Sequence, residues 1–256
     1  QTPRCGSVGL VAFIRWETRT PDPVLNLDLF RHNAVFAFSN LAALINYAAT
    51  FAVAFLLSLY LQYVRGIDAQ TAGIILLSQP MVQFIFSPLA GRLSDRIEPR
   101  ILASAGMALT TVGLALIATL NDSSSLALVI VALVVAGLGF GLFSSPNTNA
   151  VMGCVDRTCL GVASATLGAM RGIGQLLSMG IATLIITVYV GGVQITPQYH
   201  DSFVNGFRLA FIIFALLCLA GVFASLARGK THIQLPAGPS SQTAENGHWH
   251  RGRGNC

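Results

Sequence analysis

Residues 91–100 read GRLSDRIEPR, a charged stretch that contains three arginines, one aspartate and one glutamate. The twenty residues before it, 71–90, and the twenty after it, 101–120, contain no Asp, Glu, Lys or Arg. An α-helix of about 20 apolar residues is long enough to cross the hydrocarbon core of a bilayer. The pattern therefore predicts two membrane-spanning helices joined by a tight turn, whose charges stay at one membrane surface.

The composition of the whole chain supports a membrane environment. Of the 256 residues, 54% are hydrophobic and only 10% are charged, and the mean hydropathy is +0.67. A soluble domain carries about 25% charged residues. The net charge of +5 does not indicate a nucleic-acid partner, because most arginines lie between apolar runs and no basic patch alternates with aromatic residues. We expect the lipid bilayer to be the partner of this chain, and no nucleic acid.

Apolar runs on both sides of residues 91–100 extend the pattern to six predicted spans. They cover residues 34–64, 71–90, 101–120, 126–143, 161–190 and 207–226. The second run contains Pro80, which removes a backbone N–H and predicts a kink there. The predicted fold class is all-α, an integral membrane bundle of six transmembrane helices.

Three regions follow from this reading. Residues 1–33 are predicted to hold the end of a truncated upstream helix and a cytoplasmic linker, and residues 34–228 the six-helix bundle. Residues 229–256 are polar and rich in Pro, Gly and Ser, so a disordered cytoplasmic tail is expected. Because the chain starts with Gln and an apolar segment, we expect a C-terminal fragment whose partner is a missing N-terminal half of the same polypeptide.

The distribution of basic residues predicts the orientation. Alternate ends of the spans carry nine basic residues at one surface and two, Arg65 and Arg208, at the other. The nine are Arg15, Arg19, Arg31, Arg92, Arg96, Arg100, Arg157, Arg228 and Lys230. Since cytoplasmic loops are enriched in Lys and Arg, both termini and residues 91–100 are predicted to be cytoplasmic.

The sequence offers no sign of an enzyme. It contains no glycine-rich nucleotide loop, no Ser/His/Asp arrangement and no metal-ligand spacing, so neither a cofactor nor a metal is predicted. No acidic residue lies inside a predicted span. Because proton coupling needs a titratable group in the pathway, a carboxylate that carries protons would have to lie in the missing half.

Polar side chains within or near the spans are the candidates for a transport cavity. They are Asn40, Asn46, Gln79, Gln83, Asn147, Asn149 and Gln175. A few polar groups in an apolar wall can orient an amphipathic ligand, and hydrogen bonding between helices is the alternative role. Gln79 and Gln83 are four residues apart and share a helix face, so they are the preferred pair. Asn40 and Asn147 complete the predicted set of neutral cavity residues.

Arg171 lies about ten residues into a predicted span. An arginine at the bilayer centre costs about 3 kcal/mol on insertion scales, so its side chain should face protein or water. One hypothesis places Arg171 in the transport cavity or at its cytoplasmic gate. The alternative is a structural arginine that caps carbonyl groups or reaches the cytoplasmic headgroups.

Several motifs in order along the chain resemble a known family. GRLSDR at 91–96 resembles the cytoplasmic signature Gly-x-x-x-Asp-Arg/Lys-x-Gly-Arg-Arg/Lys of the major facilitator superfamily, although Glu98 and Pro99 replace its second glycine and the next basic residue. Further stretches are similar to the 14-span drug:proton antiporter branch. They are PVLNLDLFR at 23–31, GLGFGLF at 137–143 with Pro146 and Asn147, GVASA at 161–165 and MRGIG at 170–174.

The resemblance covers roughly residues 10–230 and implies a function. The chain resembles the last six spans of an exporter, a secondary active transporter that moves drug-like or amphipathic small molecules in exchange for protons. Residues 91–100 would then form a conformational gating loop, although a role in topology alone is the alternative. The gating residues would be Gly91, Arg92, Asp95, Arg96 and Arg100. A non-transporting six-helix bundle that binds partners in the membrane is the alternative function.

Overall fold

The computed structural model describes residues 33–94, 96–191 and 200–227. All its regular elements are helices. In chain order they are α3 (Ala34–Thr50), α4 (Val53–Leu59), a π-helical turn (Tyr60–Val64), α5 (Ala69–Leu76), α6 (Ser78–Ser94), α7 (Pro99–Ala118), α8 (Leu126–Gly153), a 3-10 turn (Arg157–Cys159), α9 (Leu160–Val190) and α10 (His200–Ala227). The predictions for residues 1–32 and 228–256 lie outside the described residues.

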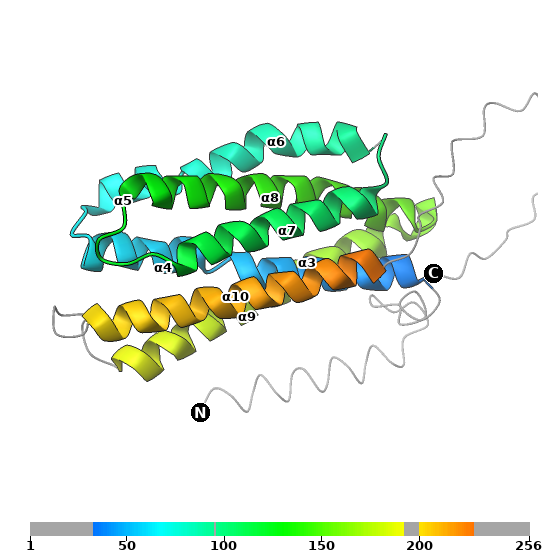
Figure 1. Ribbon diagram of the computed structural model, residues 1–256. Helices are drawn as coiled ribbons and strands as arrows, with labels where there is room; N and C mark the ends of the chain where they lie inside the picture. Colours follow the sequence, from blue (N-terminus) through cyan, green and yellow to red (C-terminus); the bar gives the residue numbers. More distant parts are fainter. Residues whose placement is uncertain (1–32, 95, 192–199, 228–256) are drawn as a thin grey trace, which may run out of the picture.

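Six helical segments in the described residues are long and apolar enough to cross a membrane. They are Ala34–Val64, Ala69–Ser94, Pro99–Ala118, Leu126–Gly153, Arg157–Val190 and His200–Ala227. The predicted all-α bundle with six spans is therefore confirmed. The helices lie side by side with their turns alternating between the two ends of the bundle (Figure 1). Within the bundle α8 packs between α6 and α7, and α10 packs against α7, α3 and α9.

Small residues set the closest contact in the bundle, which is between α7 and α8. A Cβ atom added to Gly106 of α7 would lie 2.6 Å from the backbone nitrogen of Phe143 and 2.7 Å from the carbonyl oxygen of Gly139. Small residues at such positions let two membrane helices approach backbone to backbone. This contact joins α7 and α8 into a pair, on which α6 packs through α8 and α10 packs through α7.

The first span is interrupted where α3 ends and α4 begins. The backbone N–H of Ala52, at this interruption, donates a 2.9 Å hydrogen bond to Oγ of Ser178 on α9. A break in a spanning helix frees backbone groups, which a neighbouring helix must satisfy in the absence of water. Ser178 therefore fixes α9 against the middle of the first span.

The second span is interrupted near Pro80, as predicted. Helix α5 ends at Leu76 and α6 begins at Ser78, because Pro80 has no N–H to donate to the carbonyl of Leu76. The hydroxyl of Ser78 donates a 2.7 Å hydrogen bond to the carbonyl oxygen of Ile75, which gives this carbonyl at the interruption a partner.

Three helices are longer than the sequence predicted. Helix α6 continues to Ser94 instead of ending at residue 90, and two others also extend further. Helix α8 continues to Gly153 instead of ending at Phe143, and α10 begins at His200 instead of 207. In each case polar residues at the membrane surface extend the helix beyond the apolar run on which the prediction depended. In α8 the hydroxyl of Thr148 donates to the carbonyl of Ser144, so its polarity is satisfied within the helix.

Asp68 starts α5 and gives a testable dependence on pH. Its Oδ2 accepts a 2.9 Å hydrogen bond from the backbone N–H of Thr71, and this bond holds the pKa of the Asp68 carboxyl below its ordinary value. Because the folded chain favours the ionised form, the cap contributes above the ordinary pKa and is lost as pH falls through the lowered one. We expect Asp68→Ala, or acidification of the unchanged chain, to reduce the protection of the Thr71 amide against hydrogen exchange, measured relative to the intrinsic exchange rate at the same pH. Asp68→Asn, which keeps the acceptor and cannot titrate, is the control, and equal protection in all three would contradict the capping role.

Candidate functional site

Arg171 is the centre of a polar cluster where α3, α8 and α9 meet. Its Nη2 donates a 2.6 Å hydrogen bond to Oγ1 of Thr148 on α8. Its Cζ lies 5.6 Å from the ring centroid of Tyr47 on α3, which is within the range of a cation–π interaction. The guanidinium group is therefore held by protein groups on two neighbouring helices.

The helices that carry this cluster are held close together by one glycine and one aromatic contact. A Cβ atom added to Gly174 of α9, one turn after Arg171, would lie 2.5 Å from the carbonyl oxygen of Leu44. On α8, Phe140 packs edge-on against Tyr47 with 5.2 Å between the ring centroids and 81° between the planes. The close approach of α9 to α3 and the fixed ring together position the guanidinium group.

Two asparagines that were predicted to line the cavity, Asn40 and Asn147, lie on the same helices as this cluster. Asn147 is buried, and its Nδ2 donates a 3.2 Å hydrogen bond to the carbonyl oxygen of Ser39 on α3. Asn40, the next residue on α3, is fully buried, and its Nδ2 donates to the carbonyl oxygen of Phe36 at 2.9 Å. Asn147 precedes Thr148 on α8, so Asn40, Asn147 and Arg171 lie on the same three packed helices, but no hydrogen bond between described residues joins either asparagine to Arg171.

Several buried polar atoms of this region lack a hydrogen-bond partner within the described part of the chain. They are Oδ1 of Asn40, Nε of Arg171, and both Oδ1 and Nδ2 of Asn46. An unsatisfied buried polar atom costs about 1–3 kcal/mol, so such atoms normally find a partner. In lipid that partner must be water, a bound ligand or another protein segment.

Gln79 and Gln83 are placed elsewhere. Both are half-buried on α6, and their backbones lie against Gly137 and Gly141 of α8. Gln83 lines a cavity of about 410 Å³ together with prolines and Phe84 on the exposed side of α6. No hydrogen bond between described residues joins either glutamine to Arg171 or the asparagines, so the predicted cavity set separates into two groups.

The stretch 91–100 consists of the last turn of α6, the connecting turn and the first two residues of α7, and it is anchored to α8 through its α6 part. Oγ of Ser94 donates to the carbonyl oxygen of Gly91 at 2.7 Å and accepts a 2.8 Å hydrogen bond from Nδ2 of Asn149. A Cβ atom added to Gly91 would lie 2.9 Å from Oγ of Ser145. These contacts join the end of α6 to the same end of α8 that carries Asn147 and Thr148.

Two of the charged residues of this stretch are exposed, and two others are partly buried and paired. Arg92 and Arg96 are exposed, and Nε of Arg100 forms an ion pair with Glu98 at 3.5 Å. Asp95, which the sequence placed in the gating set, lies outside the described residues.

Sequence reasoning did not find all the residues of these contacts. Tyr47 and Thr148 hold Arg171, and Ser94 and Ser145 anchor the turn, yet none of the four was singled out. An intramembrane arginine requires an acceptor or a ring on a neighbouring helix. That requirement signalled the existence of such partners, but not their positions in the chain.

The comparison with known families settles which fold family this bundle represents. Residues 40–249 match the sequence profile of the Major Facilitator Superfamily, which is most of the chain. The chain belongs to the major facilitator superfamily. Members of this superfamily are transporters and not enzymes, and they act in a lipid bilayer on small-molecule substrates.

Similar proteins of the superfamily include characterised transporters. The chain is 27% identical over 210 residues to the riboflavin transporter RibZ of Clostridioides difficile, covering 82% of this chain and 46% of RibZ. It is 29% identical over 184 residues to the multidrug resistance protein Stp of Mycobacterium tuberculosis, covering 72% of this chain and 34% of Stp. The multidrug efflux pump LfrA of Mycolicibacterium smegmatis is 26% identical over 186 residues, covering 72% of this chain and 37% of LfrA. This major facilitator chain spans about half the length of RibZ and less of Stp and LfrA.

Proposed function

We propose that this major facilitator chain is the C-terminal half of a 14-span drug:proton antiporter, which exports drug-like or amphipathic small molecules. The observation that carries the proposal is a set of buried polar atoms of Arg171, Asn40 and Asn46 that have no hydrogen-bond partner among the described residues. A few polar groups in an apolar wall are what a site for amphipathic ligands requires. The similarity to Stp and LfrA, both named for drug resistance or efflux, favours this substrate class.

A second bundle is the expected partner of the faces that this chain leaves uncovered. Only 11% of the most apolar window in span Ala69–Ser94 and 28% of that in Arg157–Val190 is buried, compared with 56% in the first span. An N-terminal half packed on α6 and α9 would cover Gln79, Gln83 and the open side of the Arg171 cluster together. Transport would then follow from the rocking of the two halves about a site near the midplane.

The turn at residues 91–100 is suited to couple that motion to the site. Its anchor on α8 lies at Ser145 and Asn149, close in the helix to the site residues Asn147 and Thr148. A displacement of the turn would therefore move the cytoplasmic end of α8 and the acceptor of Arg171. The proposed gating residues are Gly91, Arg92, Asp95, Arg96 and Arg100, of which Asp95 lies outside the described residues.

The orientation and the proton pathway complete the proposal. Arg65 and Arg208 both donate hydrogen bonds to the turn between α7 and α8, to the carbonyl oxygen of Asp122 and to Oδ1 of Asn121. These two arginines mark the outer surface, and the termini lie in the cytoplasm of a multi-pass cell-membrane protein. Within the described spans the only carboxylate is Asp201, exposed at the start of α10, so the proton-carrying carboxylate belongs to the N-terminal half.

Transport measurements on the protein joined to its N-terminal half test the proposal. In inverted membrane vesicles with an acidic interior, addition of ethidium is expected to release protons, and a protonophore is expected to abolish ethidium accumulation. Vesicles that carry the present chain alone are the control and should show neither effect. Proton release that is independent of ethidium, ethidium movement that is insensitive to the protonophore, or the absence of both would contradict a drug:proton antiporter. The absence of both would favour a non-transporting bundle.

A further inference from the structure

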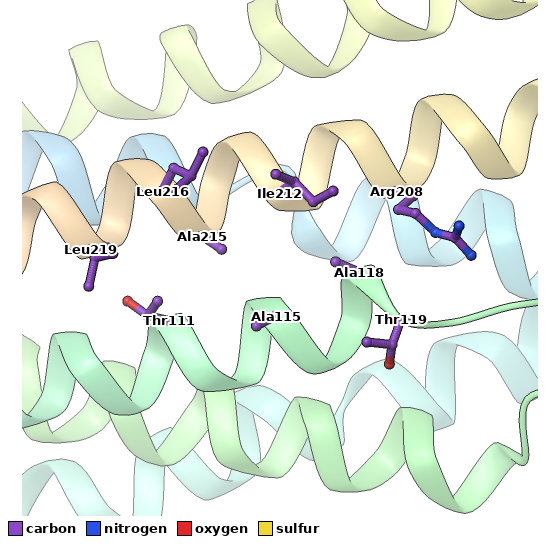
Figure 2. Close-up of a pocket in the computed structure, with 9 residues that line it drawn as sticks. All are labelled: Thr111, Ala115, Ala118, Thr119, Arg208, Ile212, Ala215, Leu216 and Leu219. Atoms are coloured by element: carbon purple, nitrogen blue, oxygen red, sulfur yellow. The ribbon is translucent and has the colours of Figure 1, made fainter.

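A groove of about 560 Å³ runs along the contact between α7 and α10, away from the Arg171 cluster (Figure 2). Its floor on α7 includes Thr111, Ala115 and Ala118, and its wall on α10 includes Ile212 and Leu216. Positions 111, 115 and 118 follow each other at spacings of four and three, and so do 212 and 216 with Leu219, so each helix contributes one face. Small side chains on α7 face large apolar side chains on α10, which leaves an open apolar channel.

At one end of the groove, helices α7 and α10 are in close contact. At that end Oγ of Ser104 donates a 2.9 Å hydrogen bond to Oγ of Ser225, and Cε of Met107 lies where a Cβ atom of Gly221 would be. The antiparallel helices then continue past alanines on α7, and the contact opens into the groove from Thr111 to Thr119.

A single positive charge lies at the open end of the groove. Arg208 lines this end together with Thr119, and its side chain extends beyond the end of α7 (Figure 2). Its Nη2 donates a 2.6 Å hydrogen bond to Oδ1 of Asn121, and the guanidinium group is exposed. The ion pair between Arg100 and Glu98 is the only one among the described residues, so no carboxylate of the described chain neutralises Arg208. The nearby Asp122 and Asp201 line a neighbouring polar cavity together with Asn121, the hydrogen-bond partner of Arg208.

The length of the groove matches one leaflet of a bilayer. From Thr111 to Thr119 an α-helix rises about 12 Å, and from Arg208 to Leu219 about 16 Å. The hydrocarbon core of a bilayer is about 30 Å thick, so one leaflet measures about 15 Å. A lipid with its headgroup at Arg208 would therefore place its acyl chain along the whole groove.

We propose that this groove binds one phospholipid, with the phosphate at Arg208 and an acyl chain between α7 and α10. The charge of Arg208 complements the phosphate, because a guanidinium group donates paired hydrogen bonds to phosphate oxygens. The apolar walls complement the acyl chain over the thickness of one leaflet. The site is independent of the transport proposal, since it uses neither Arg171 nor the turn at residues 91–100.

Native mass spectrometry of the purified chain in detergent, titrated with dioleoylphosphatidylglycerol, tests the site. The unchanged chain is expected to retain one lipid, and dioleoylglycerol, which has the same chains and no phosphate, is expected to bind far more weakly. Arg208→Gln is expected to weaken retention of the phospholipid about tenfold, because the charge-assisted contact with phosphate is lost. Arg65→Gln is the matched control, since it removes a charge that donates to the same turn and does not line the groove.

A second pair of variants tests the acyl-chain seat. Ala115→Phe fills the groove and is expected to weaken phospholipid retention about tenfold or more, because the bulk occupies the place of the chain. Ala127→Phe, at an exposed alanine of α8 outside the groove, should retain the lipid. Circular dichroism establishes that each variant is folded, and if Ala115→Phe does not fold, the two arginine variants decide the question. Equal retention by Arg208→Gln and Arg65→Gln, undiminished retention by folded Ala115→Phe, or equal binding of dioleoylglycerol would overturn the proposal.

Discussion

Replacing Gly139 with alanine is expected to destabilise this major facilitator bundle by about 2–3 kcal/mol, the upper range for overpacking a membrane or protein core. The added methyl group would lie 2.5 Å from Oγ1 of Thr110 and 2.7 Å from the carbonyl oxygen of Gly106, and it would also meet the backbone nitrogen of Thr110. Two of these three atoms belong to the backbone, so rotation of a side chain cannot remove the overlap. Helices α7 and α8 would have to separate. The midpoint of thermal unfolding in detergent is the measurement.

Gly168 provides a control of the opposite sign. It lies within α9, and no atom lies within 4 Å of the position of an added Cβ. Gly168→Ala is expected to stabilise the chain by about 0.5–1 kcal/mol, because alanine loses less backbone freedom than glycine when a helix forms. A shift of the same sign and size in both variants would contradict the close α7–α8 contact, since helix propensity alone makes no distinction between the two glycines.

Replacing Arg171 with alanine is expected to reduce ethidium efflux by the proposed full-length exporter at least about tenfold. The variant loses the hydrogen bond to Thr148 and the cation over Tyr47, and it removes the charged donor from the proposed cavity wall. Arg171→Lys keeps the charge but not the planar donor group, so we expect it to restore little of the efflux. Initial efflux rates from cells with equal amounts of protein in the membrane are the measurement.

Two variants of Tyr47 distinguish a role of Arg171 in transport from a role in packing. Tyr47→Phe keeps the ring beneath the guanidinium group and its edge contact with Phe140, so efflux should stay near that of the unchanged protein. Tyr47→Ala removes both contacts, so it should impair efflux, as Arg171→Ala is expected to do. Unchanged efflux in Arg171→Ala would discard the cavity hypothesis. A loss of efflux matched by an equal loss of thermal stability would assign Arg171 to the structural role.

The candidate site was only partly predictable from the sequence. Arg171 was singled out as a candidate because a charge within a long apolar run is costly unless protein or water surrounds it. Asn40 and Asn147 were singled out because amide side chains within a membrane span need hydrogen-bond partners. Gln79 and Gln83 lie on α6 with their backbones against α8, and no hydrogen bond between described residues joins them to Arg171, so their place in the cavity stays a prediction. Which way a helix face turns depends on the neighbour it packs against, and four-residue spacing contains no information about that neighbour.

The sequence by itself determined that this chain crosses a membrane six times, because the length and hydropathy of a run are local properties that decide its partition into lipid. The charged stretch at residues 91–100 and the motifs that resemble the major facilitator superfamily were also predictable, because each is a local pattern of residue types. Only the tertiary structure decided that Tyr47 and Thr148 hold Arg171, that Ser94 and Asn149 anchor the turn, and that α7 and α10 part to form a lipid-sized groove. Those outcomes depend on how far helix backbones approach and rotate, which is fixed by glycines and alanines from distant parts of the chain meeting in space.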